Sequence, residues 1–167
     1  MKRIIGNASL TFEELTTLFV QIEAILNSRP LTPLSSDPND PLPLTPGHFL
    51  IGRPLTAVPS LPIMALRPSR FELVEKLRQH FWARWSREFV AELQQRTKWR
   101  TQQGDLHIGD IVVLKNDQLP PIQWRLGRIQ RFYPGPDGVN RVADVYTKQG
   151  VVRRALSRMC LLPTTML

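Results

Sequence analysis

The sequence contains one cysteine, Cys160, and three histidines among its 167 residues. A single cysteine excludes an internal disulfide, which fits a reducing compartment. The histidines, His48, His80 and His107, fall in different segments, so the spacing predicts no zinc site, and we expect no cofactor. Cys160 lies in the apolar stretch "MCLLP" with no histidine nearby in the sequence, which favours a buried, inert thiol over a catalytic nucleophile.

Long apolar runs are also missing. No stretch approaches the roughly 18 apolar residues that a membrane-spanning helix needs, so we expect no membrane partner. The first residues, "MKRIIGNASLTFEEL", have neither a sustained apolar run nor a small-residue cleavage site, which argues against a secretory signal. The chain instead reads as one cut within a domain.

Carboxylates that could hold a pair of magnesium ions are hard to find. Such a site needs about three acidic side chains that converge from the ends of strands and helices. The acidic residues of the first 66 positions open a predicted helix, lie in its middle or lie in the proline-rich segment: Glu13, Glu14, Glu23, Asp37 and Asp40. We therefore predict no catalytic residues and no metal site.

Positive charge is plentiful and unevenly distributed. The net charge is +8 and the pI is about 10.5. Residues 1–66 carry 4 basic and 5 acidic side chains (net −1), residues 67–104 carry 9 and 4 (net +5), and residues 105–167 carry 9 and 5 (net +4). A domain this basic is typical of nucleic-acid binding, although anionic membranes and acidic proteins exploit the same field.

The first 66 residues predict a helix followed by a proline-rich segment. Thr11 and Glu14 form a capping box, and Pro30 ends the helix. The apolar stripe of this helix is Leu15, Leu18, Phe19, Ile22, Ile25 and Leu26. Ten of the 15 prolines then fall between Pro30 and Pro68, which predicts an extended stretch packed on the helix, with a short helical turn near "TPGHFLIG".

Residues 67–104 predict one long helix. Ser69 and Glu72 form a second capping box, and no glycine or proline follows before about Trp99. A four-residue repeat, Leu73, Leu77, Phe81, Trp85, Phe89 and Leu93, forms a ridge that we expect to be structural, with Trp82 and Trp99 off it. Basic side chains surround this ridge: Arg78, Arg84, Arg87, Arg96, Lys98 and Arg100.

Residues 105–167 predict four or five short strands. The runs "IVVL", "VNRVADVYT" and "VVRRALS" have β-type composition, and "YPGPDG" and "KQG" are turn sequences. The alternation slips at Gly127, which suggests a β-bulge there. So many short strands in about sixty residues indicate a small β-barrel with an SH3-like meander, so the fold class as a whole is α+β.

This barrel segment holds the candidate DNA-binding residues. Arginine and lysine side chains interleaved with Trp124, Tyr133 and Tyr146 suit contacts to phosphates and exposed bases. The first candidates for phosphate contacts are Arg125, Arg128, Arg131, Arg153 and Arg154, followed by Lys115, Arg141 and Lys148. A solvated sheet surface is the structural alternative.

The order of the pieces is itself informative. "EAILNSRPLTP", "FWARWSREFVAELQQRTKW" and "WRLGRIQRFYPGPDG" are followed by "RRALSRMCLLP", within a pattern that extends from about residue 2 to residue 163. This arrangement resembles the C-terminal part of integrases from Bel-Pao type retrotransposons. The resemblance implies that residues 1–66 are the helical end of an RNase H-like core with its proline-rich segment. Residues 67–104 would be the connecting helix, and residues 105–167 an SH3-like barrel that engages DNA.

The same resemblance implies a chain without its own chemistry. The family holds two magnesium ions with an Asp, Asp, Glu triad, and its final Glu belongs to a helix upstream of "KRIIGNASLTFEEL". Glu13 and Glu14 do not occupy that position. We therefore expect a truncated integrase region that binds DNA non-specifically, is not itself an enzyme, and takes no small-molecule substrate. Its other partners would be a second copy or full-length integrase, in the nucleus or the cytoplasm.

Two other classes of function remain open on the sequence. A small barrel could read chromatin peptides if Trp124, Tyr133 and Tyr146 formed one aromatic cage, although their alternation does not obviously place them on one face. The chain could also be an inert or assembly-only remnant, because the apolar stripe of its first helix, from Thr11 to Leu26, would have no core left to cover.

Overall fold

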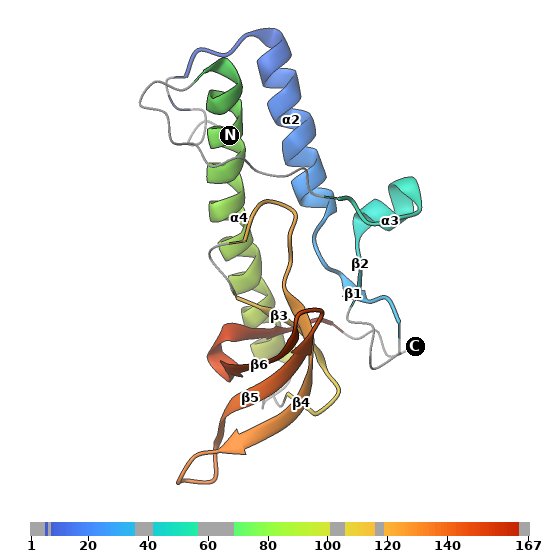
Figure 1. The fold of residues 1–167 in the computed structure, drawn as a ribbon, viewed down its shortest axis with the longest axis vertical. Helices are drawn as coiled ribbons and strands as arrows, with labels where there is room; N and C mark the ends of the chain where they lie inside the picture. Colours follow the sequence, from blue (N-terminus) through green and yellow to red (C-terminus); the bar gives the residue numbers. More distant parts are fainter. Residues whose placement is uncertain are drawn as a thin grey trace.

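The computed structural model describes residues 6, 8–35, 42–56, 69–100, 106–115 and 119–163, with the side chains of the long helix described as far as Gln94. Within these residues the fold is α+β, with three α-helices and a five-stranded antiparallel sheet. Two helices, α2 and α4, run side by side, and the sheet packs at the far end of α4 (Figure 1). The predictions made for the side chains of Arg96, Lys98, Trp99 and Arg100 therefore concern residues outside the described part.

Helix α2 (Phe12–Asn27) begins at the predicted capping box. The Thr11 hydroxyl accepts the Glu14 N–H at 3.3 Å, and the Glu14 carboxylate accepts the Thr11 N–H at 2.8 Å. These bonds satisfy two amides that the first helical turn leaves without partners. The predicted apolar stripe is buried at Leu18, Ile22 and Ile25, whereas Phe19 remains 47% exposed.

Helix α4 (Arg70–Arg100) covers the buried stripe of α2. The second capping box is also present, because the Ser69 N–H donates to Glu72 and the Glu72 N–H donates to Ser69. Val74 and Leu77 of α4 form one core cluster with the stripe of α2. The prediction that the stripe has nothing left to cover is therefore wrong, because the long helix begins beside Glu14 and runs along the stripe in the same direction as α2.

The proline-rich segment forms short elements between these helices. Strand β1 (Thr32–Pro33) pairs with β2 (Pro43–Leu44) in an antiparallel ladder of two residue pairs. Helix α3 (Pro46–Ile51) follows and confirms the predicted helical turn. It ends at Gly52, whose φ of 71° is one that glycine adopts without a steric penalty.

The sheet is an open meander. Its strands are β3 (Ile111–Leu114), β4 (Leu126–Pro134), β5 (Asn140–Thr147), β6 (Gly150–Ala155) and β7 (Met159–Leu161). The order across the sheet is β6-β5-β4-β3-β7, so β6 and β7 are edges and do not pair with each other. The predicted meander is present, but the sheet is not closed into a barrel. A 3₁₀ turn, η1 (Leu156–Arg158), leads from β6 to β7. Strand β7, within the apolar stretch "MCLLP", was not predicted from the sequence.

Both faces of β3 are buried, which explains its continuous apolar run. On one face, Ile111 and Val113 pack with Leu126, Cys160 and the Val90 side of α4. On the other face, β3 contributes to a second cluster inside the curved sheet, formed by Val112, Leu114, Ile129, Ala143, Val145 and Met159. Helix α4 therefore shares the first of these clusters with the sheet, and the second is formed without α4.

The predicted β-bulge lies at a different position. Gly127 pairs regularly with Val112, and the register of β4 on β5 shifts instead between Ile129 and Arg131 and again between Tyr133 and Pro134. A side chain at Gly127 would place its Cβ 2.4 Å from Val145 Cγ1 and 2.6 Å from the Tyr146 carbonyl oxygen. The glycine thus allows a close approach between β4 and β5 and does not mark the bulge.

Candidate nucleic-acid interface

Strand register places several candidate residues on one face of the sheet. Arg131 lies opposite Asp144, and Asp144 lies opposite Arg153, so these three side chains share a face across β4, β5 and β6. Tyr133, two residues after Arg131, lies on the same face. We call Arg131, Tyr133, Asp144 and Arg153 the β4–β6 outer face. It turns away from the cluster inside the curved sheet, and α4 packs on β7 at the far edge.

The Tyr133 ring organises two guanidinium groups on this face. The guanidinium carbon of Arg153 lies 4.0 Å from the ring centroid, and that of Arg131 lies 5.2 Å from it. Both arginines are exposed, and Arg131 has no hydrogen-bond acceptor among the described residues. Cation–π contact restricts where the two charges can point, so less conformational entropy is lost when they meet an anion.

Asp144 holds Arg153 and Tyr133 in place through hydrogen bonds. Its carboxylate accepts two hydrogen bonds from Arg153, at 2.8 and 3.1 Å, and one from the Tyr133 hydroxyl at 2.6 Å. The Arg153 hydrogen bond, followed by that from Tyr133, lowers the pKa of Asp144 to about 2. The same pair raises the pKa of Arg153. The face therefore keeps two positive charges and one negative charge throughout the physiological range.

Two of the arginines predicted to contact phosphate instead make hydrogen bonds within the protein. The Arg128 guanidinium donates to the Gly109 carbonyl oxygen at 2.7 Å, and so supports the turn before β3. Arg141 pairs with Asp137 within the turn between β4 and β5. Their hydrogen-bond donors are partly committed, as are those of Arg153 to Asp144, and Arg131 is the candidate without such a bond among the described residues.

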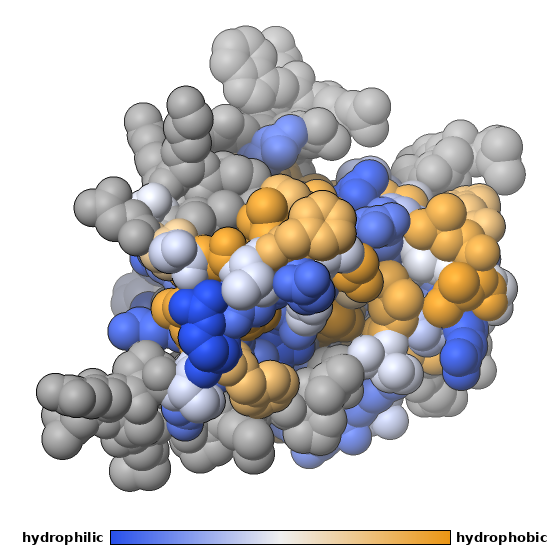
Figure 2. Space-filling view, turned by 90° about the horizontal axis from the view of Figure 1, so that it is seen from above, coloured by the Kyte–Doolittle hydropathy of each residue, from blue (hydrophilic) through white to orange (hydrophobic). Residues whose placement is uncertain are grey.

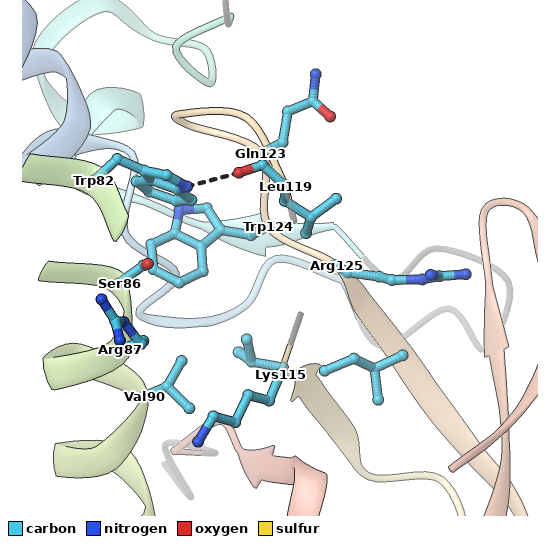
Figure 3. A pocket seen from close by; sticks show the side chains of 11 residues that line it. Trp82, Ser86, Arg87, Val90, Lys115, Leu119, Gln123, Trp124 and Arg125 are labelled. Atoms are coloured by element: carbon cyan, nitrogen blue, oxygen red, sulfur yellow. Dashed lines mark hydrogen bonds between the residues drawn. The ribbon is translucent and has the colours of Figure 1, made fainter. Parts of the chain in front are cut away.

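The remaining candidates do not converge with the outer face. Arg154 points to the opposite side of β6 from Arg153, because neighbouring strand residues alternate. Lys148 is exposed in the turn between β5 and β6, and Arg125 precedes β4. Lys115 follows β3 and lines a small cavity of about 20 Å³ beside α4. Figure 3 shows Lys115 and Arg87 on the α4 side of this cavity, with Arg125 extending away from them.

The aromatic side chains of the α4 ridge pack against one another, as their helical spacing predicted. Phe81, Trp85 and Phe89 stack along α4, with centroid distances of 6.3 and 5.4 Å between neighbours. Trp82, which lies off that ridge, is also buried, and its indole N–H donates to the Leu119 carbonyl oxygen at 2.8 Å (Figure 3).

Trp124 belongs to this cluster. Its ring lies 4.9 Å from Trp82, 5.8 Å from Trp85 and 5.4 Å from Phe89, in edge-to-face contacts. Its indole N–H donates to Ser28 Oγ at 3.3 Å. Trp124 therefore joins the sheet to both α4 and the end of α2, and it does not form an aromatic cage with Tyr133 and Tyr146.

The other reactive side chains have structural surroundings. Cys160 is buried, its thiol lies 3.7 Å from the Val90 carbonyl oxygen, and burial raises the pKa of the thiol to about 11. The predicted burial of this thiol is confirmed. Glu14 is hydrogen-bonded to Arg70, which lowers the pKa of its carboxyl group. In the part of the chain that the structure describes, no three His, Cys, Asp or Glu side chains gather as a metal site, and no helix is long and apolar enough to cross a membrane.

These features describe a basic α+β module in which a long helix supports an open antiparallel sheet. The sequence model of a protein family described as "Family of unknown function (DUF5641)" matches residues 69–162, more than half of the chain. The chain belongs to this family. The match begins at the N-cap of α4 and ends just after β7, so it covers the helix and the sheet together. No curated protein and no solved structure matches the chain.

Proposed function

We propose that this chain is the C-terminal region of a Bel-Pao type retroelement integrase and binds DNA non-specifically through the β4–β6 outer face. In this proposal α2 and α3 are the helical end of an RNase H-like core, α4 is the connecting helix, and the sheet is an opened SH3-like module. The chain contributes DNA binding and not catalysis, since the motifs of the resemblance belong to the region after the family's acidic triad.

One observation carries the DNA-binding proposal. Arg131 and Arg153 are exposed on one face and lie over the same Tyr133 ring. Arginine is well suited to phosphate because its planar guanidinium presents several N–H donors in a fixed arrangement. The 105–167 segment carries a net charge of +4, so the surrounding field attracts a polyanion as well.

Strand order supports the fold part of the proposal. The meander β3-β4-β5-β6, with β7 returning to pair with β3, is the connectivity expected of an SH3-like unit whose last strand rejoins the first. Arg131 lies on β4, at the centre of this sheet, and Arg153 lies on the edge strand β6, so the proposed contact surface runs from the centre of the sheet to one edge.

Salt-dependent binding tests this function. We would measure the affinity of the full chain for a fluorescently labelled 20-base-pair duplex by anisotropy, from about 50 to 200 mM salt. The logarithm of affinity should fall linearly with the logarithm of salt concentration, because each neutralised phosphate releases counterions. The Arg131→Met, Arg153→Met double variant should weaken binding to all sequences alike and reduce the slope by about 2.

A second double variant, which also removes two positive charges, is the control. Arg53→Met with Arg84→Met removes two cations away from the outer face, an exposed one after the end of α3 and a partly exposed one on α4. It should leave the slope within about 0.5 of the parent chain. Absence of binding at the lowest salt would refute DNA binding, and an equal loss in both double variants would refute the assignment to this face.

A second property, association with a like chain, is favoured by exposed apolar side chains. Phe49, Leu50 and Ile51 of α3 are 74, 64 and 50% exposed, and Phe12 and Val20 of α2 are 79 and 59% exposed. Seen from above, hydrophobic side chains gather toward the side on which α3 lies (Figure 2). Apolar patches of this kind mark association surfaces. Sedimentation velocity of the chain and of the Phe49→Ser, Leu50→Ser variant tests this, since the variant should shift any dimer toward monomer.

A further inference from the structure

A groove separate from the β4–β6 outer face lies between the two halves of the molecule. Its volume is about 520 Å³, within the range of about 300–1,000 Å³ typical of ligand sites. Five segments form its walls: the end of α2, strand β2, the loop after α3, the loop before β4, and the turn between β5 and β6. Much of its surface is apolar, from Leu42, Pro43, Leu55, Leu119, Ile122 and Trp124.

The charged groups of the groove are both positive. Arg125 and Lys148 line it from different segments, and the described lining contains no acidic side chain. Arg125 Nε is buried without a hydrogen-bond partner among the described residues, a state that costs free energy unless a ligand supplies an acceptor. The charges thus favour an anionic occupant.

Two side-chain amides complete the polar part of the groove. Gln123 and Gln149 are exposed at its edge, and neither side chain has a hydrogen-bond partner in the described part of the chain. Each amide offers both a donor and an acceptor, the combination with which glutamine recognises a base edge. An acidic peptide side chain, which offers acceptors alone, would use only half of this capacity.

One wall of the groove holds an unusual backbone conformation. Ile122 has a φ of 70°, in the left-handed region that β-branched residues avoid, and it lies in a turn closed by the Gln123 N–H and the Pro120 carbonyl oxygen at 3.2 Å. Such conformations persist where the surrounding structure enforces them, and they concentrate at binding sites. The turn places Ile122 and Gln123 side by side in the groove lining.

We propose that this groove binds unpaired nucleotides of a nucleic-acid strand. The apolar walls receive the base, the Gln123 and Gln149 amides contact its edge, and Arg125 and Lys148 contact the flanking phosphates. This inference rests on the proposed nucleic-acid binding but concerns a different surface. A duplex held by the outer face would leave the groove free for an unpaired end.

The test uses a fluorescein-labelled oligothymidylate of five nucleotides, which cannot form a duplex, with the full chain. Gln149→Trp should fill the groove and Lys148→Met should remove a cation, and each should weaken binding of this probe at least about fivefold, the loss of one stacked or phosphate-anchored base. The matched controls, Gln130→Trp on the exposed surface of β4 and Lys76→Met on the exposed surface of α4, should not weaken it, because neither residue lines the groove.

The outcomes separate this inference from the duplex-binding proposal. The Arg131→Met, Arg153→Met variant should lose duplex affinity yet bind the pentanucleotide as the parent does. If the pentanucleotide fails to bind the parent chain, or binds both groove variants as tightly as the parent chain, the groove inference is overturned even where duplex binding persists. If pentaglutamate displaces the pentanucleotide at equal concentration and ionic strength, the groove is a site for acidic peptide and the inference is also overturned.

Discussion

The guanidinium carbon of Arg153 lies 4.0 Å from the centroid of the Tyr133 ring. Both residues also bond to Asp144, which accepts from Arg153 at 2.8 Å and from the Tyr133 hydroxyl at 2.6 Å. One carboxylate thus holds an arginine and the aromatic ring beneath it in a single orientation. The arrangement spans three strands, so it can form only after β4, β5 and β6 have paired.

Removal of the Arg153 charge should raise the pKa of Asp144 from about 2 toward its ordinary value of 3.8. The folded-state pKa is depressed, so the pair stabilises the fold above pH 4 and loses this effect as the pH falls from about 4 to about 2. An NMR titration of the Asp144 carboxyl carbon in the parent chain and in Arg153→Met measures the shift. Arg154→Met, whose side chain lies on the other face, should leave the pKa unchanged, and equal shifts in both variants would contradict the assignment.

Truncation of Trp124 should destabilise the whole chain. Its ring contacts Trp82, Trp85 and Phe89, and its N–H reaches Ser28, so Trp124→Ala removes contacts among three parts of the fold. We expect a loss of about 3 kcal/mol in the free energy of unfolding, measured by urea denaturation. Tyr146→Ala, on the half-buried surface of β5, should cost less. Similar losses for the two variants would mean that Trp124 is not a core residue.

Local signals in the sequence predicted the helices well. Each capping box, at Thr11 and at Ser69, involves only four consecutive residues, and both are present as predicted. Prolines excluded a long helix from the segment after α2, and the short turn at Pro46 was also predicted. These features depend on backbone geometry that neighbouring residues determine, so no tertiary information was required.

Features that depend on distant contacts were harder to predict. Trp124 looked like a surface aromatic because its partners on α4 lie about 40 positions earlier in the sequence. The bulge was placed at Gly127 because a glycine interrupts the alternation there, whereas that glycine accommodates Val145 of the neighbouring strand. Composition alone could not separate Arg128, committed to Gly109, from Arg131, which has no such acceptor. The groove joins five segments, and no local pattern indicated it.

A buried ion pair on α4 offers a third prediction. Glu75 and Arg78 are each 5% exposed, and the Arg78 guanidinium donates to Glu75 at 2.6 Å. Arg78→Met should cost about 3 kcal/mol, because it leaves a buried carboxylate without its charge partner. The Glu75→Met, Arg78→Met double variant should recover most of this loss, since a pair of apolar side chains fills the same space without a charge to desolvate. Urea denaturation of all three chains measures the coupling, and a double variant less stable than Arg78→Met would contradict it.

Substitution of Gly127 by alanine should weaken the sheet at its centre. The added Cβ would lie 2.4 Å from Val145 Cγ1 and 2.6 Å from the Tyr146 carbonyl oxygen, closer than unbonded atoms approach. Backbone atoms make up part of that contact, so β4 and β5 must separate, and we expect a loss of about 2 kcal/mol in the free energy of unfolding. Hydrogen exchange should locate the effect, with faster exchange at the amides that pair β4 with β5.

Gln130→Ala is the matched control, because Gln130 is an exposed β4 residue whose truncation requires no strand movement. It should change stability by less than about 0.5 kcal/mol. A Gly127→Ala variant as stable as the control would show that β4 and β5 can separate without cost. In that case the glycine is not needed for the close approach of the two strands that carry Arg131 and Asp144. The expected loss in the free energy of unfolding would instead show that the β4–β6 outer face depends on the absence of a side chain at Gly127.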